Sequence, residues 1–142
     1  MATPDELRAA LAEARADFRK AISDAAGAWE KTPAQGEGEE AWSPRQAAEH
    51  AIAAEAYFTS AICKACGYPG VDRVEPAYAG ADEAIRAFDE VVEMCNKKLQ
   101  YITETDLEKS HERFGTVENL MQVNAGHMRE HAAQMRAVAG MA

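Results

Sequence analysis

Apolar residues recur at spacings of three and four along most of the chain, which is the pattern of amphipathic α-helices that bury one face. The first such stretch predicts a helix over residues 5–30, with Thr3 as a cap and Pro4 at its start. Its apolar stripe consists of Leu7, Leu11, Ala14, Phe18, Ala21, Ile22, Ala25 and Trp29. No stretch alternates between apolar and polar residues over the length of a typical strand, so we expect a helical protein.

The same spacing predicts three further helices. Ser43 and Pro44 open a helix over 44–66, which Gly67 can end in a left-handed cap. Asp82 can cap a helix over 82–102, and Thr116 can cap one over 117–139. The segment between the last two helices shows little periodicity, so we expect a loop there.

Four amphipathic helices can bury four apolar stripes together in a four-helix bundle, so the predicted fold class is all-α. We expect residues 1–142 to form a single domain. The connections of about 13–15 residues are longer than the usual turns of a bundle and could return along its whole length. The second and third helices could therefore run parallel, although the pattern alone does not decide the topology.

The charge balance limits the partners of the protein. The chain carries 15 Lys and Arg residues against 24 Asp and Glu residues, a net charge of −9. Such a surface would repel phosphate backbones and anionic lipid, so we expect no nucleic-acid partner and no membrane partner. Three cysteines do not make a disulfide framework, and the first residues are too charged for a signal peptide. These features predict a cytoplasmic protein.

Three of the four histidines fall on the predicted buried stripes: His50 on the second helix, and His127 and His131 on the fourth. Residues four apart project from one helix face, so His127 and His131 can bind one ion, and His50 on a facing helix can complete the set. Three protein ligands leave positions open for water or substrate, as in catalytic metal sites. A single buried histidine is more often a hydrogen-bonded packing residue, but three at compatible depths favour a metal.

The spacing does not identify the metal, because imidazole suits zinc, nickel, copper and iron. The Glu-x-x-His pairs of di-iron bundles are absent, since Ala47, Asn124 and Met128 stand three residues before the histidines. There is also no HExxH motif. Asn124 could orient a ligand from outside the first coordination shell, or could instead bond a neighbouring helix. Gln134, one turn after His131, is a weaker candidate for the same role.

Cys63 and Cys66 form a C-x-x-C motif, which in isolation suggests redox chemistry or half of a zinc site. They lie at the predicted C-terminal end of a helix, where the helix dipole disfavours a thiolate. Packing at the helix end is therefore the simpler interpretation. His111 lies in the polar loop and is expected to be solvated.

Trp42-Ser43-Pro44 leads into the helix of His50, and His127-x-x-x-His131-x-x-Gln134 follows on the last helix. This arrangement resembles the DinB/YfiT-like family of metalloenzymes over nearly the whole chain. The resemblance implies an up-down-down-up bundle with a left-handed twist, a divalent metal (zinc, nickel or iron) bound by the three histidines, and often a homodimer. Several members are thiol-dependent transferases or isomerases that use bacillithiol, mycothiol or glutathione, including mycothiol-dependent maleylpyruvate isomerase.

We therefore expect a metal-dependent enzyme that uses a small thiol as cosubstrate and acts on a small electrophilic substrate, as a transferase or isomerase. Two alternatives stay open, namely a metal-dependent hydrolase and a bundle that carries a metal, or none, without catalysis. No catalytic base can be named from the sequence. A homodimer is expected mainly from the resemblance, with Trp29 or Trp42 as an available anchor, although Trp42 is better placed as a hydrophobic staple before Ser43.

Overall fold

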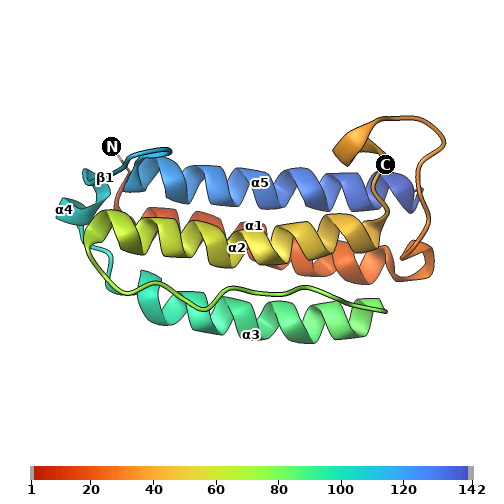
Figure 1. Ribbon diagram of the computed structural model, residues 1–142, viewed down its shortest axis with the longest axis horizontal. Helices are drawn as coiled ribbons and strands as arrows, with labels where there is room; N and C mark the ends of the chain where they lie inside the picture. The colour runs from red at the N-terminus through yellow and green to blue at the C-terminus, as the bar shows by residue number, and fades with distance from the viewer. Residues whose placement is uncertain (1, 141–142) are drawn as a thin grey trace.

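Four long helices make up most of the protein in the computed structural model, which describes residues 2–140 (Figure 1). They are α1 (Pro4–Asp24), α2 (Pro44–Cys66), α3 (Ala81–Leu99) and α5 (Val117–Val138). The connections contain the 3-10 turns η1 (Ala26–Ala28) and η2 (Gly38–Ala41), the one-turn helix α4 (Glu104–Leu107), and an antiparallel hairpin of β1 (Ser110–His111) and β2 (Gly115–Thr116). The predicted all-α fold class is confirmed.

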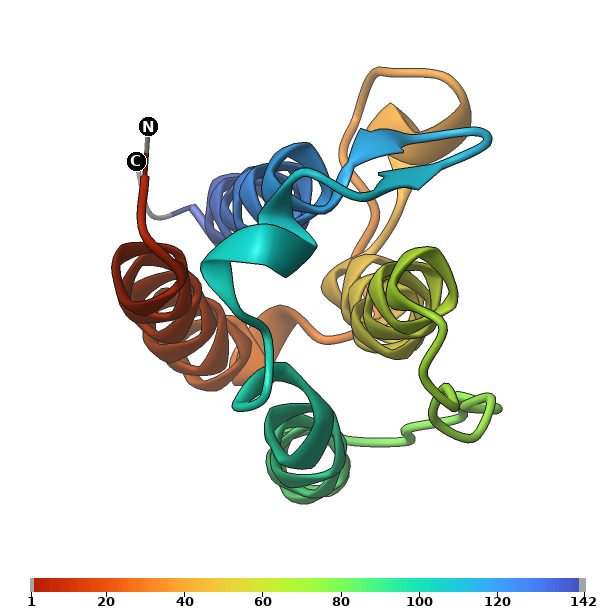
Figure 2. The same ribbon diagram turned by 90° about the vertical axis from the view of Figure 1, so that its left-hand side faces the viewer.

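The long helices form a ring in which α5 and α3 each pack against both α1 and α2, as the end-on view of Figure 2 shows. In Figure 1, α1 and α5 run in one direction along the bundle, and α2 and α3 run in the other. The connection over residues 67–80 allows α2 and α3 to be parallel, because it returns along the bundle beside both of them. The predicted left-handed twist stays a prediction. Within residues 2–140, no helix has the length and apolar character that crossing a membrane requires.

The ends of α2 and α5 follow local chemistry that was read from the sequence. The Ser43 hydroxyl accepts from the Gln46 backbone, and the Gln46 side chain accepts from the Ser43 backbone, which completes a capping box. Gly67 ends α2 with a φ of 79°, a conformation that favours glycine. The Thr116 hydroxyl caps α5 by accepting from the Asn119 backbone. The starting positions of the two histidine-bearing helices are thus fixed by the sequence around them.

The predicted helix over 5–30 was wrong at its C-terminal end, because α1 stops at Asp24. A short 3-10 turn then brings the Trp29 side chain into the core, where it is 6% exposed and its Nε1 donates to the Tyr78 carbonyl at 2.9 Å. Burial of the Trp29 ring contributes more to stability than continuation of the helix would. Trp29 is therefore not available as an anchor for a dimer.

Two further expectations about the second half of the chain need correction. α3 begins at Ala81 and ends at Leu99, with Gly80 rather than Asp82 at the N-cap position. The segment expected to be a loop contains α4 and the hairpin, and Thr103 forms a capping box with Asp106 at the start of α4. Asp106 also accepts from the Tyr68 hydroxyl, a contact across 38 residues of sequence that local periodicity could not reveal.

Candidate metal centre

The three predicted histidines meet where α2 and α5 pack against each other. His50 Nε2 lies 3.3 Å from His127 Nε2, and His131 Nε2 lies 3.1 Å from the same atom. One ligand nitrogen from each residue falls within 4.8 Å of the other two. His127 and His131 are one turn apart on α5, and the antiparallel course of α2 brings His50 to their level. The three side chains predicted to share a site are therefore brought together.

These distances are those expected between nitrogen ligands of one ion. Zinc binds imidazole nitrogens at about 2.0–2.1 Å, which places two ligands of a tetrahedral ion roughly 3.3 Å apart and two adjacent ligands of an octahedral ion roughly 2.9 Å apart. The separations of 3.3 and 3.1 Å between the histidine nitrogens fall within this range. A network of N–H···N bonds accounts less well for the cluster, because His127 Nε2 faces two nitrogens with one hydrogen or one lone pair to offer. The residues present thus fit a metal ion, and the three histidines could hold one.

Gln134 determines which ring nitrogen of His131 carries the hydrogen and which is left with a free lone pair toward the cluster. Its amide nitrogen donates to the Glu39 carbonyl, so its oxygen Oε1 faces His131 Nδ1 at 2.8 Å. Because a carbonyl oxygen can only accept, Nδ1 carries the hydrogen and Nε2 of the neutral ring is left as the ligand atom. From the sequence, Gln134 was a weaker candidate than Asn124 for orienting a metal ligand. Its position three residues after His131 was the available signal for this role, whereas the sequence could not reveal its contact with Glu39.

Asn124 is directed at a different group. Its amide nitrogen donates to Glu55 Oε2 at 2.8 Å, and Glu55 also pairs with the buried Arg15. Of the two roles left open for Asn124, bonding to a neighbouring helix is therefore the one that the structure shows. Because Glu55 lies on α2 and Asn124 on α5, this bond holds together the two helices that carry the histidines.

The surroundings of His50 and His127 favour neutral imidazole, which is the form that binds a metal. Burial, with smaller contributions from His131 and His50, lowers the pKa of His127 to about 4. Burial and then His131 also lower the pKa of His50. The Glu39 carboxylate acts in the opposite direction, since its Oε1 lies 3.6 Å from His50 Nε2. The half-buried Trp42 ring lies against the cluster, with its centre 5.0 Å from that of His50 and 6.1 Å from that of His131.

The lowered pKa of His127 predicts that the metal-free protein becomes less stable as the pH falls from about 7 toward 4. In the unfolded chain a histidine binds its proton near pH 6.5, whereas folded His127 does so only near pH 4. Between these values the unfolded state binds more protons, so the free energy of unfolding decreases as the pH decreases. Urea titrations at about pH 7 and about pH 5 measure this loss. It should shrink in His127→Gln but not in His111→Gln, and equal losses in both variants would contradict the assignment.

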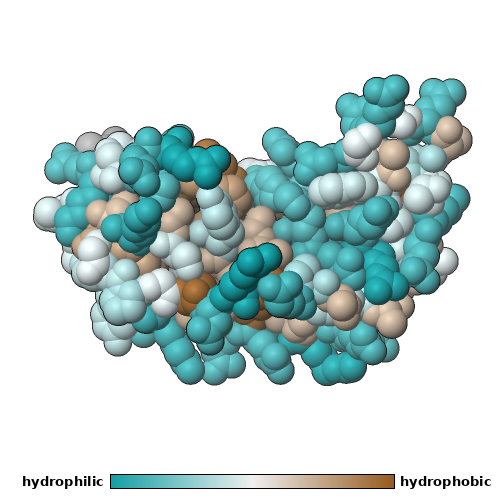
Figure 3. All heavy atoms as spheres, in the orientation of Figure 1, coloured by the Kyte–Doolittle hydropathy of each residue, from teal (hydrophilic) through white to brown (hydrophobic). Residues whose placement is uncertain are grey.

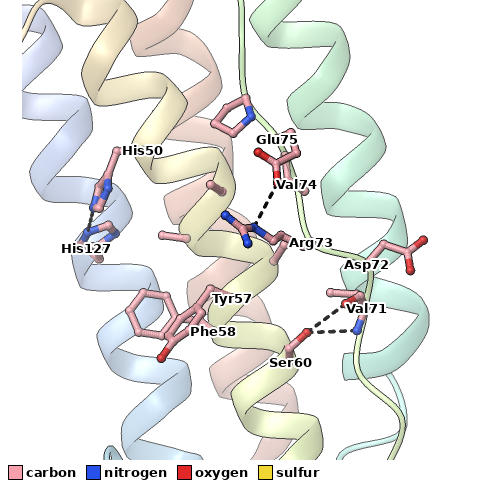
Figure 4. A pocket seen from close by; sticks show the side chains of 14 residues that line it. His50, Tyr57, Phe58, Ser60, Val71, Asp72, Arg73, Val74, Glu75 and His127 are labelled. Atoms are coloured by element: carbon pink, nitrogen blue, oxygen red, sulfur yellow. Dashed lines mark hydrogen bonds and ion pairs between the residues drawn. The ribbon is translucent and has the colours of Figure 1, made fainter.

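A cavity of about 760 Å³ opens beside the histidines, between α2 and the 67–80 connection (Figure 4). His50 and His127 line it, and most of its other wall residues are apolar, among them Ala53, Tyr57, Phe58, Val71, Val74 and Pro76. Figure 3 shows apolar surface gathered in a hollow on this face of the molecule. Tyr57 is 50% exposed, and its side chain lines this cavity. The cluster is thus accessible to a small molecule.

The cysteines and the fourth histidine lie outside the cluster. Cys63 and Cys66 are buried, and burial raises the pKa of Cys63 and, with nearby Asp106, that of Cys66 to about 11. Thiols in this state are poor nucleophiles, in agreement with packing at the helix end. His111 belongs to β1, where its Nδ1 accepts from the Arg113 backbone at 3.0 Å.

The bundle and its histidine cluster together define an all-α protein with a site that could hold a divalent metal ion. The family model of the DinB superfamily matches residues 10–135, and the chain belongs to this superfamily. The match includes all three histidines and confirms the resemblance noted in the sequence. Comparisons with curated proteins and with solved structures gave no significant match.

Proposed function

We propose that the protein is a divalent-metal-dependent enzyme that joins a small thiol to an electrophilic substrate or uses that thiol to isomerise it. The observation that carries this proposal is the convergence of three histidine nitrogens, two of which belong to residues that line a largely apolar cavity. When bound, a divalent cation would favour ionisation of a thiol, or of water, beside it and so supply the nucleophile. Superfamily membership supports a metal-dependent protein.

The residues of the chain would hold the ion and shelter the reaction. His50, His127 and His131 would be the ligands, with His131 oriented by Gln134. The apolar wall residues Tyr57 and Phe58 would exclude water from the substrate. Among the described residues that line the cavity, the carboxylates are Asp72 and Glu75, and Glu75 is paired with Arg73. This arrangement favours a thiol over water as the nucleophile, because a thiol ionises near a cation without the help of a strong base.

The test is conjugation of monochlorobimane with bacillithiol, mycothiol or glutathione by protein loaded with zinc, nickel or ferrous iron. We expect a rate above the uncatalysed reaction that requires both the metal and one of the thiols. His127→Gln should lose this rate, whereas the matched variant His111→Gln should keep it, since His111 lies outside the cluster. Absence of catalysis with every combination of metal and thiol would refute the proposal.

A second candidate is metal-dependent hydrolysis, which the position of Glu39 favours. Its carboxylate lies 3.6 Å from His50 Nε2 and is 61% exposed, so it could accept a proton from a water molecule at the cluster. Turnover of an ester without any thiol, and its loss in Glu39→Gln with metal binding retained, would identify this activity. A metal-binding bundle without catalysis is the remaining alternative. The homodimer and the cytoplasmic location stay predictions.

A further inference from the structure

Arg73 is the cationic side chain among the described residues that line the cavity. It extends from the 67–80 connection toward α2, on the side of the cavity that faces His50 and His127 (Figure 4). Its Nε lies 3.2 Å from Glu75 Oε1, and both side chains are largely exposed, at 87% and 79%. Within residues 2–140, no protein group accepts a hydrogen bond from the two terminal nitrogens of this guanidinium.

A carboxylate from a ligand is well suited to these two nitrogens. A guanidinium has five N–H donors in a fixed fork, and it binds a carboxylate best through two parallel hydrogen bonds. Glu75 meets Arg73 at Nε in an exposed pair, and such pairs contribute little because water screens them. The other carboxylate of the connection, Asp72, points away from α2 (Figure 4). Arg73 is therefore able to receive an anion from inside the cavity.

Two aromatic side chains of α2 line the part of the cavity next to His127 (Figure 4). They are Tyr57 and Phe58, and the Phe58 ring centre lies 5.7 Å from that of His127. The Tyr57 ring contacts Phe58 and Phe114 edge-on, with centres 6.1 and 5.8 Å away. Half of Tyr57 is nevertheless exposed, so a flat apolar group that lay on this ring would remove it from water.

We propose that the cavity binds a small molecule with an apolar, preferably aromatic, body and one carboxylate. Arg73 holds the carboxylate, and the body lies along Tyr57 and Phe58 toward the three histidines. The identification of this molecule as the electrophilic substrate rests on the proposed function, whereas its binding to the cavity does not. A cavity of about 760 Å³ is ample for a molecule of this kind.

The experiment compares 1-naphthylacetate with its neutral analogue 1-naphthylacetamide by isothermal titration calorimetry. Chelator-treated protein is used, because a bound ion could itself attract the carboxylate, and circular dichroism verifies that its helices are retained. We expect the acid to bind about two- to fivefold more tightly than the amide, the range of a single exposed charge-assisted contact. Equal affinities, or no binding of either compound, would overturn the proposal.

Three variants assign the contact to its residue. Arg73→Gln should remove the preference for the acid and leave the affinity for the amide unchanged. Glu75→Gln should strengthen binding of the acid, because it removes the carboxylate that competes for Arg73. The control is Arg129→Gln, which removes a charge from an exposed pair with Glu13 outside the cavity and should change neither affinity. A preference for the acid that survives in Arg73→Gln would place the anion elsewhere and overturn the proposal.

The outcome is separable from that of the thiol reaction. Binding of the acid through Arg73 without thiol-dependent catalysis would support this cavity assignment and leave the proposed function refuted. Thiol-dependent catalysis, together with an acid preference that is unchanged in Arg73→Gln, would support the proposed function and refute this cavity assignment.

Discussion

Replacement of Arg15 by Ala should lower the free energy of unfolding by about 3–5 kcal/mol, the typical cost of leaving one member of a buried ion pair without its partner. Arg15 on α1 pairs with Glu55 on α2, and these side chains are 7% and 0% exposed. Arg15 Nη1 also donates to Asn96 on α3 at 2.6 Å, while Glu55 accepts from Asn124 on α5. These four side chains therefore connect all four long helices. Without Arg15, the Glu55 carboxylate would be buried with no cation beside it.

Urea unfolding at neutral pH measures this change, with Arg129→Ala as the control. Arg129 belongs to an exposed pair with Glu13, so its loss should cost less than about 1 kcal/mol. The double variant Arg15→Met with Glu55→Leu should recover much of the lost stability, because no unpaired charge is left inside. A loss of less than about 1 kcal/mol in Arg15→Ala would show that the pair does not hold the bundle together in this way.

The second large effect is expected in His127→Ala. Zinc at about 100 times its Kd should stabilise the wild-type protein by about 2.7 kcal/mol, provided that it binds the folded state alone. His127 Nε2 lies between the other two ligand nitrogens, so its removal should abolish this stabilisation. Gln134→Leu should keep the effect but need roughly 10–100 times more zinc, since it loses the bond that orients His131.

Thermal melts with and without zinc measure both variants, and His111→Ala is the matched control. His111 lies outside the cluster, so this variant should respond to zinc as the wild-type protein does. A zinc response in His127→Ala equal to that of the control would mean that the stabilising ion binds at another place.

The bounds of α2 and the histidine cluster were predictable because they depend on local chemistry and on helix geometry. Ser43, Pro44 and Gly67 mark the ends of α2 within a few residues of sequence. Helical periodicity then places His127 and His131 on one face of α5, and the rise per residue puts His50 at a compatible depth on α2.

The features that the sequence did not reveal depend on contacts between distant residues. α1 stops early because Trp29 reaches the Tyr78 carbonyl in the core, 49 residues away. Gln134 orients His131 through the Glu39 carbonyl, 95 residues away. The cavity likewise needs the 67–80 connection to return beside α2, and residues 71–76 show no periodicity that would predict a wall. Their roles could be recognised only once the helices were placed in space.

The most direct test of the three-histidine metal centre is anomalous diffraction at the zinc edge from crystals of the zinc-loaded protein. The structure predicts one strong peak between α2 and α5, at about 2.0–2.1 Å from the Nε2 atoms of His50, His127 and His131. A zinc ion held elsewhere, for example by Cys63 and Cys66, or no peak at the histidines in zinc-saturated crystals, would contradict the central claim.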